Sequence, residues 1–243
     1  MEFLRVASGS PALPEIVLKG EDDRLPGRGA ALARYAATLT AAPWSVTPEL
    51  GAQLAARGLG TDAVQAATAI VAMFNYLTRV ADATGIEFDY PSPLPVFLPD
   101  RGREPEPRPA PAAWPVVAAD MRTLPDFPAA TQAWQRWREY VFDSDTPLTV
   151  RERRLLAAAA ARECCDRTRA DELAAYAPRD DRDSLLVAFA GKLSRQPWRM
   201  GPADLQALRD AGHPEVALLH AISVVALQNA ESRLAMGLAL VAG

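Results

Sequence analysis

The sequence has few of the residues from which catalytic and metal sites are usually built: its 243 residues include two cysteines and two histidines. The cysteines, Cys164 and Cys165, are adjacent, and neighbours in sequence rarely form a stable disulfide with each other because the peptide between them is strained. A disulfide framework is therefore not expected, and we predict a reducing, cytoplasmic location. Adjacent thiols also lack the spacing of about two to four residues that structural zinc sites use, so we expect no metal and no cofactor.

Basic charge and unbroken apolar runs are scarce as well. The net charge of -4 argues against a nucleic-acid partner or an anionic membrane surface, because both require a basic patch. The N-terminus shows no basic segment followed by an apolar one, so no signal peptide is predicted. The most apolar stretch, residues 216–242, contains Gln228, Glu231 and Arg233 among its polar residues. We interpret it as a buried core helix, because a membrane span rarely tolerates so many polar groups.

An internal repeat is the clearest feature that the sequence does have. Residues 32–81 align without a gap to residues 186–235, at an offset of 154, and 15 of the 50 pairs are identical. The identical pairs include Pro43 and Pro197, Trp44 and Trp198, Gly58 and Gly212, Asn75 and Asn229, and Arg79 and Arg233. Composition alone does not explain this agreement, so we interpret it as a duplication, which is a primary guide to the fold.

Each repeat is predicted to form three helices. Apolar positions at helical spacing, followed by a proline break, a short helix that ends at a glycine and a long apolar helix, recur in both copies. The first helices are expected over residues 30–41 and 184–195, and the long ones over about 62–84 and 214–240. Because alanine and valine occupy most of their faces, the long helices should be central.

The segment between the repeats has a different composition. Residues 91–128 contain eleven of the 21 prolines, which is typical of a linker or an extended surface arm. An amphipathic helix is predicted for residues 129–142. Thr149 and Glu152 then form a candidate capping box, which opens a helix predicted to continue to about residue 176.

These patterns predict an all-α chain of two tandem units. The first unit would span residues 1–90 and lack the N-terminal helices of the second, the proline-rich linker or arm would span 91–128, and the second unit would span 129–243.

The second unit resembles the alkylhydroperoxidase D / carboxymuconolactone decarboxylase family. The segments that carry the resemblance are LTVRERRLLAAAAARECC, LLVAFAGKLSRQPW and AISVVALQNAESRLA, and AMFNYLTRVADATG in the first unit matches the same pattern. The resemblance implies helical units assembled into trimers or hexamers, so we expect self-association. It also implies reduction of hydroperoxides by a Cys-x-x-Cys-x-x-x-His motif or, in a sister branch, decarboxylation of a lactone.

The chemistry of the full motif requires a thiolate that attacks the peroxide and a second thiol that resolves the resulting sulfenic acid. Alignment to the motif places Cys165 at the second cysteine, Arg162 at the first and Arg169 at the histidine. Cys164 is predicted to lie about 100° around the same helix. Glu152 falls near the family's upstream glutamate. The candidate catalytic residues are therefore Cys165, Cys164 and Glu152, and nearby arginines would lower the pKa of Cys165.

Several interpretations remain open on the sequence alone. The leading one is an alkylhydroperoxidase-like antioxidant oxidoreductase that reduces a small peroxide with a cysteine thiol and an external thiol reductant. The alternatives are an inactive family member that acts as a scaffold or binds a small molecule, with Cys165 as a buried core residue, and a decarboxylase-like lyase. Residues 2–9 resemble the segment directly after the cysteine motif in the family, so we expect either that the first unit has lost its catalytic helix or that the natural chain starts upstream of Met1.

Two repeated pairs suggest a structural role. Asn75 and Arg79 in the first unit, and Asn229 and Arg233 in the second, lie four residues apart and therefore share a helix face. Because the units agree here and differ in their cysteine motif, we expect these pairs to stabilise the scaffold or a subunit contact. The run Arg151 to Arg154 is expected to be a solvated first turn.

Overall fold

A computed structural model describes residues 10, 12–86, 109–122 and 128–241 of the chain. Every regular element in these residues is helical, so the chain is all-α, as the sequence predicts. The α-helices are α2 (Ala12–Lys19), α3 (Gly27–Ala41), α4 (Pro48–Ala56), α5 (Thr61–Thr84), α6 (Pro128–Asp143), α7 (Val150–Glu163), α8 (Arg167–Glu172), α9 (Asp181–Arg195), α10 (Pro202–Asp210) and α11 (Glu215–Leu238). The short 3-10 helices are η1 (Asp22–Arg24), η2 (Pro43–Ser45), η3 (Ala119–Arg122) and η4 (Pro197–Arg199). Within the described residues, none of the helices is both long and apolar enough to span a bilayer.

The boundaries of the helices follow the sequence repeat. The elements α3, η2, α4 and α5 begin and end 154 residues before α9, η4, α10 and α11, respectively. Gly58 and Gly212 follow the two short helices α4 and α10, with φ angles of 75° and 87°. Glycine tolerates this left-handed conformation better than other residues, which explains why both short helices end at the repeated glycine.

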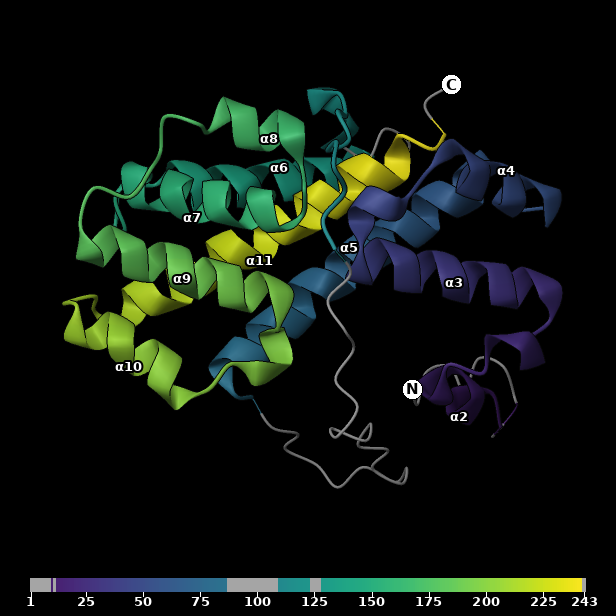
Figure 1. The fold of residues 1–243 in the computed structure, drawn as a ribbon, viewed down its shortest axis with the longest axis horizontal. Helices are drawn as coiled ribbons and strands as arrows, with labels where there is room; N and C mark the ends of the chain where they lie inside the picture. The colour runs from purple at the N-terminus through teal and green to yellow at the C-terminus, as the bar shows by residue number, and fades with distance from the viewer. Residues whose placement is uncertain (1–9, 11, 87–108, 123–127, 242–243) are drawn as a thin grey trace.

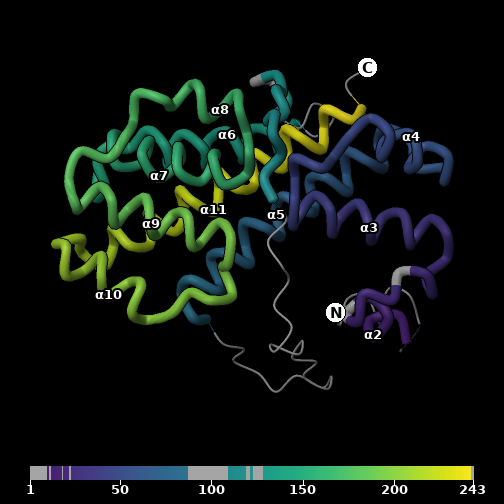
Figure 2. The backbone as a smooth tube through the Cα atoms, viewed as in Figure 1, coloured from purple at the N-terminus to yellow at the C-terminus, as the bar shows by residue number. Residues whose placement is uncertain are grey.

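Helices α5 and α11 lie side by side through the middle of the molecule (Figure 1). The smooth trace in Figure 2 shows α3 and α4 on one side of this pair and α7, α9 and α10 on the other. The cores interlock, since Ala83 of α5 joins the apolar cluster built mainly from α7, α9 and α11, while Ala235 and Met236 of α11 join the cluster built mainly from α3, α4 and α5. The two long helices are therefore central. Each predicted unit contributes side chains to the core of the other, so the predicted boundaries at residues 90 and 129 do not separate two independent cores.

Two residues in the described part of the proline-rich segment, Val117 and Arg122, pack against the bundle, whereas most of residues 109–118 are exposed. Val117 is buried, and its backbone N–H and C=O both hydrogen bond to the Thr168 hydroxyl of α8, at 3.2 and 2.7 Å. Arg122, in η3, is buried against Asp166. Residues 91–108 and 123–127 of the predicted arm lie outside the described residues, as do residues 2–9.

Candidate functional site

The two cysteines lie in a turn and not within one continuous helix. Helix α7 ends at Glu163, Cys164 is its C-terminal cap, and Cys165 has a left-handed backbone with φ 53°. The predicted helix to residue 176 is therefore wrong, and so is the argument that placed the cysteines around one helical surface. Asp166 opens the next helix, α8, by accepting a hydrogen bond from the backbone N–H of Arg169 at 3.1 Å.

Cys165 is buried in a setting that disfavours its thiolate. Burial, followed by the proximity of Cys164 and Glu163, raises the pKa of the Cys165 thiol to about 11. The prediction that nearby arginines lower this pKa is wrong. Arg169 is instead paired with Glu172 at 2.8 Å, and Arg167 lies 3.5 Å from Asp171.

Cys164 is part of a hydrogen-bonded network on α11. Its Sγ lies 3.4 Å from Asn229 Oδ1, to which it donates, and 3.4 Å from Arg233 Nη1, which donates to the sulfur. The side chain is almost completely inaccessible to solvent, and both cysteines are free. Cys164 therefore contacts groups that also fix the packing of α11.

The repeated asparagine and arginine pairs connect the two halves reciprocally. Arg79 on α5 donates to the Ser194 carbonyl of α9 at 2.9 Å, and Arg233 on α11 donates to the Thr40 carbonyl of α3 at 2.8 Å. Ser194 and Thr40 are themselves separated by the repeat offset. Each arginine also bonds the asparagine one turn before it, at 2.8 and 2.9 Å. These contacts support the scaffold role expected for the repeated pairs.

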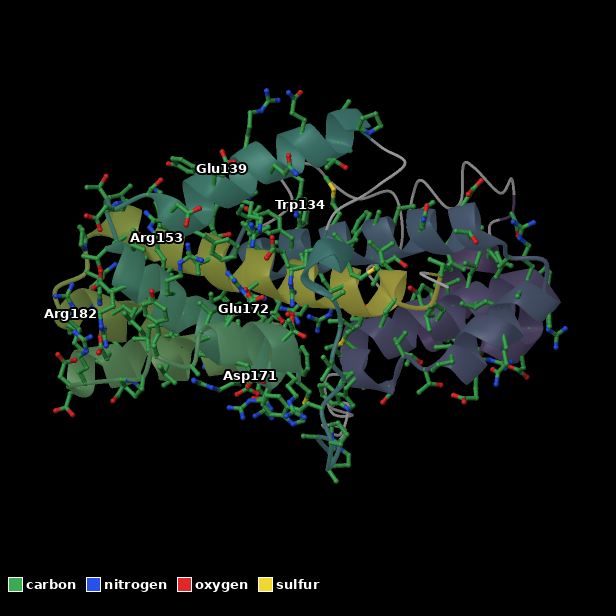
Figure 3. All side chains as sticks on the ribbon, turned by 90° about the horizontal axis from the view of Figure 1, so that it is seen from above. Trp134, Glu139, Arg153, Asp171, Glu172 and Arg182 are labelled. Atoms are coloured by element: carbon green, nitrogen blue, oxygen red, sulfur yellow. The ribbon has the colours of Figure 1, made fainter. Side chains whose placement is uncertain are left out.

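Glu152 lies at the opposite end of α7 from the thiols. It completes the predicted capping box, because Thr149 Oγ1 accepts from the Glu152 N–H while Glu152 Oε2 accepts from the Thr149 N–H. A helical rise of about 1.5 Å per residue puts roughly 18 Å between Glu152 and Cys164 along the axis, too far for a direct proton transfer. Glu152 also pairs with Arg182 at 3.4 Å. Figure 3 shows Arg182 at one end of the bundle and Glu172, the last residue of α8, nearer its middle.

The histidines also belong to that distant end of α7. His213 accepts a hydrogen bond from Arg182 at 3.2 Å. His220 lies 3.0 Å from Arg153, whose guanidinium is completely buried and donates to three backbone carbonyls. The expectation that the arginine run forms a solvated turn is wrong for Arg153. The structure therefore brings no histidine and no predicted acid next to the thiols.

A second surface, which the sequence interpretation did not single out, lies between α5 and α6. It is an open groove of about 810 Å³. Its lining residues all have uncharged side chains: Ala66, Ala69, Ile70, Ala72, Met73, Phe74, Tyr76, Leu77, Ala130, Ala133, Trp134, Trp137 and Leu234. Desolvating a charged group here would be unfavourable, so the groove suits a neutral, apolar occupant.

One side of the groove is an exposed apolar stripe on α5. We define the α5 stripe as Ile70, Met73, Phe74 and Leu77, which are 59%, 54%, 60% and 45% exposed. Their spacing places them on one helix face. A contiguous exposed apolar patch on a folded chain commonly marks an interaction site. The pattern was visible in the sequence, but periodicity alone could not show which apolar face of α5 would be left uncovered.

Helix α6 forms the other side of the groove with aromatic side chains. The Trp137 ring lies 6.4 Å from that of Tyr76 in an edge-to-face arrangement and 5.5 Å from that of Tyr140. Trp134 packs toward α11 and α5, as Figure 3 shows, and its buried Nε1–H has no acceptor among the described residues.

Comparison with known proteins does not identify a relative: no family model, no curated protein and no solved structure matches the chain. The resemblance to the alkylhydroperoxidase D family is therefore a hypothesis that rests on the quoted motifs. Among the described residues, no group of three or more His, Cys, Asp and Glu side chains is arranged to hold a metal ion.

Proposed function

We propose that this protein is a binding scaffold that acts through the α5–α6 groove and not through thiol chemistry. The observation that carries the proposal is the α5 stripe, where four large apolar side chains at helical spacing are about half exposed beside an uncharged groove. Burying such a surface is favourable, at about 25 cal/mol per Å² of apolar area removed from water.

The surroundings of the two thiols also favour a binding scaffold over a thiol-dependent peroxidase. A peroxidase cysteine must be largely ionised near neutral pH, and the raised pKa of Cys165 works against this. The Cys164 thiol is already hydrogen-bonded to Asn229 and Arg233. The predicted acid, Glu152, is at the far end of α7. The thiol-dependent peroxidase and the lactone lyase therefore remain predictions drawn from the family resemblance, with less geometric support than the groove.

A neutral fluorescent probe tests the proposal. N-phenyl-1-naphthylamine gains fluorescence in apolar surroundings. When this probe is titrated into protein at a concentration of about 0.1 µM, we expect saturable binding. The double variant Phe74→Gln/Leu77→Glu should lose this binding, because it places an amide and a charge in the groove. Both side chains are exposed, so helical content should be unchanged.

The matched control is Leu219→Glu. Leu219 is a 50% exposed leucine on α11 that is not part of the groove lining. Probe binding should persist in this variant and in Cys164→Ser/Cys165→Ser. Equal probe binding by the wild type and the groove variant would contradict the proposal.

A further inference from the structure

We infer that the occupant of the α5–α6 groove is a second copy of this chain, with the α5 stripe of each copy seated in the groove of the other. This inference rests on the proposed function, since it names the partner of the same surface. It begins from the two apolar faces of α5. One face, which includes Val64, Thr68 and Val71, is buried in the bundle, whereas the α5 stripe on another face is exposed. A helix that is apolar on most faces is normally buried all round.

In the second repeat, the equivalent face of the long helix α11 is covered by other helices. The residues of α11 that lie 154 positions after the α5 stripe are Val224, Leu227, Gln228 and Glu231, and all four are completely buried. Helices of the same chain cover them. Arg169 of α8 donates to Gln228 at 3.2 Å, and Arg138 of α6 donates to Glu231 at 2.6 Å. This face of the repeated long helix therefore accepts other helices as its cover.

The chemistry of the two faces determines what kind of helix can cover α5. Gln228 and Glu231 on α11 are matched by arginines, but the equivalent residues on α5 are Phe74 and Leu77. A partner presenting an arginine would bury it without a carboxylate, which is costly. The cover of α5 must therefore be apolar, and the α5 stripe itself satisfies this requirement. In a twofold dimer the same patch serves both copies, so a patch that complements itself is sufficient.

The exposed apolar area is adequate for a weak but specific dimer. The α5 stripe continues into the exposed rings of Trp137 and Tyr140 on α6. If large side chains contribute roughly 150–250 Å² each when fully covered, burying these half-exposed groups removes on the order of 600 Å² per chain from water. Standard interfaces bury about 800 Å² per partner and weaker ones less, so this area fits a weak dimer that dissociates on dilution.

Sedimentation equilibrium of the full chain from about 0.1 to 100 µM tests the inference. The wild type should change from monomer to dimer across this range. Phe74→Gln/Leu77→Glu introduces at both positions the residues that the other repeat has there, and it should remain monomeric with unchanged circular dichroism. Leu219→Glu should dimerise like the wild type. A wild type that is monomeric throughout, or a groove variant that dimerises equally well, would overturn the inference.

The neutral probe separates failure of this inference from failure of the proposed function. If a second copy fills the groove, it competes with the probe. The number of probe molecules bound per chain should then fall as the protein concentration rises through the dissociation constant of the dimer. A monomer that binds the probe at every concentration would retain the groove as a binding site but reject a second copy as its occupant, in favour of a small molecule. A monomer that binds no probe would reject both.

Discussion

Arg79 and Arg233 occupy equivalent positions on the two central helices, and each bonds a backbone carbonyl of the other half. Arg79 Nη2 lies 2.9 Å from the Ser194 oxygen, and Arg233 Nη2 lies 2.8 Å from the Thr40 oxygen. Burial, together with the charge of Arg233, lowers the pKa of Arg79. Two buried guanidinium groups are thus held mainly by neutral acceptors, which makes them important for the packing of α5 against α11.

Replacing Arg233 should therefore destabilise the whole chain. Arg233→Met removes the donor to Thr40 and leaves acceptors without partners, at a cost of about 1–3 kcal/mol. The measurement is the free energy of unfolding in urea. Arg209→Met is the control, since Arg209 forms an exposed pair with Glu215 and should behave as the wild type. Equal stability of the Arg233 and Arg209 variants would contradict the assigned role.

The close approach of α11 to α3 and α5 depends on Gly237. A Cβ atom added there would lie 2.4 Å from Thr68 Cγ2 and 2.6 Å from the Tyr35 hydroxyl. Gly237→Ala should therefore overpack the core and cost about 1–3 kcal/mol. Gly29→Ala is the matched control, because a Cβ atom there meets its nearest neighbours at 3.7 and 3.8 Å, which is ordinary contact. Thermal unfolding measures the stability of both variants, and equal stability of Gly237→Ala and Gly29→Ala would show that α11 does not need a glycine at this contact.

The reactivity of Cys165 should depend steeply on pH. A thiol is neutral when protonated, so a pKa raised from 9.0 to about 11 means that the folded state favours the thiol form over a wider range. At pH 7 the thiolate fraction is about one in ten thousand. Alkylation of Cys165 by iodoacetamide, followed by mass spectrometry, should be slow at pH 7 and accelerate up to about pH 11.

The same pKa shift has a consequence for stability. The unfolded chain loses the Cys165 proton near pH 9.0 and the folded chain near pH 11, so the folded state is favoured below this window and loses that advantage as the pH rises through it. Urea-unfolded protein should be alkylated faster at pH 8 than folded protein. Rapid alkylation of folded protein at pH 7 would show that the thiol is activated.

Much of the fold could be predicted from the sequence because the relevant signals are local or repeated. The helix boundaries follow from prolines and glycines such as Pro48 and Gly58, and from the apolar spacing that both repeats share. The capping box at Thr149 is a local pattern of the same kind. Such signals act over a few residues and are little affected by the rest of the chain.

The candidate site was harder to predict because distant contacts determine it. The break after Glu163 accompanies the burial of Asp166, which bonds Arg122 and Ser232 from separate parts of the chain. Arg153 was expected to be solvated, but its guanidinium is enclosed by the carbonyls of a preceding turn. No local pattern contains these partners. The uncovered α5 stripe likewise depends on which helix faces the other elements leave free.

The rate of cumene hydroperoxide consumption in the presence of dithiothreitol shows whether this protein works through its thiols. We expect the wild type and Cys165→Ser to show the same rate, equal to that of dithiothreitol alone. A wild-type rate clearly above this background, lost in Cys165→Ser, would show that the thiol is active and favour the peroxidase that the family resemblance implies.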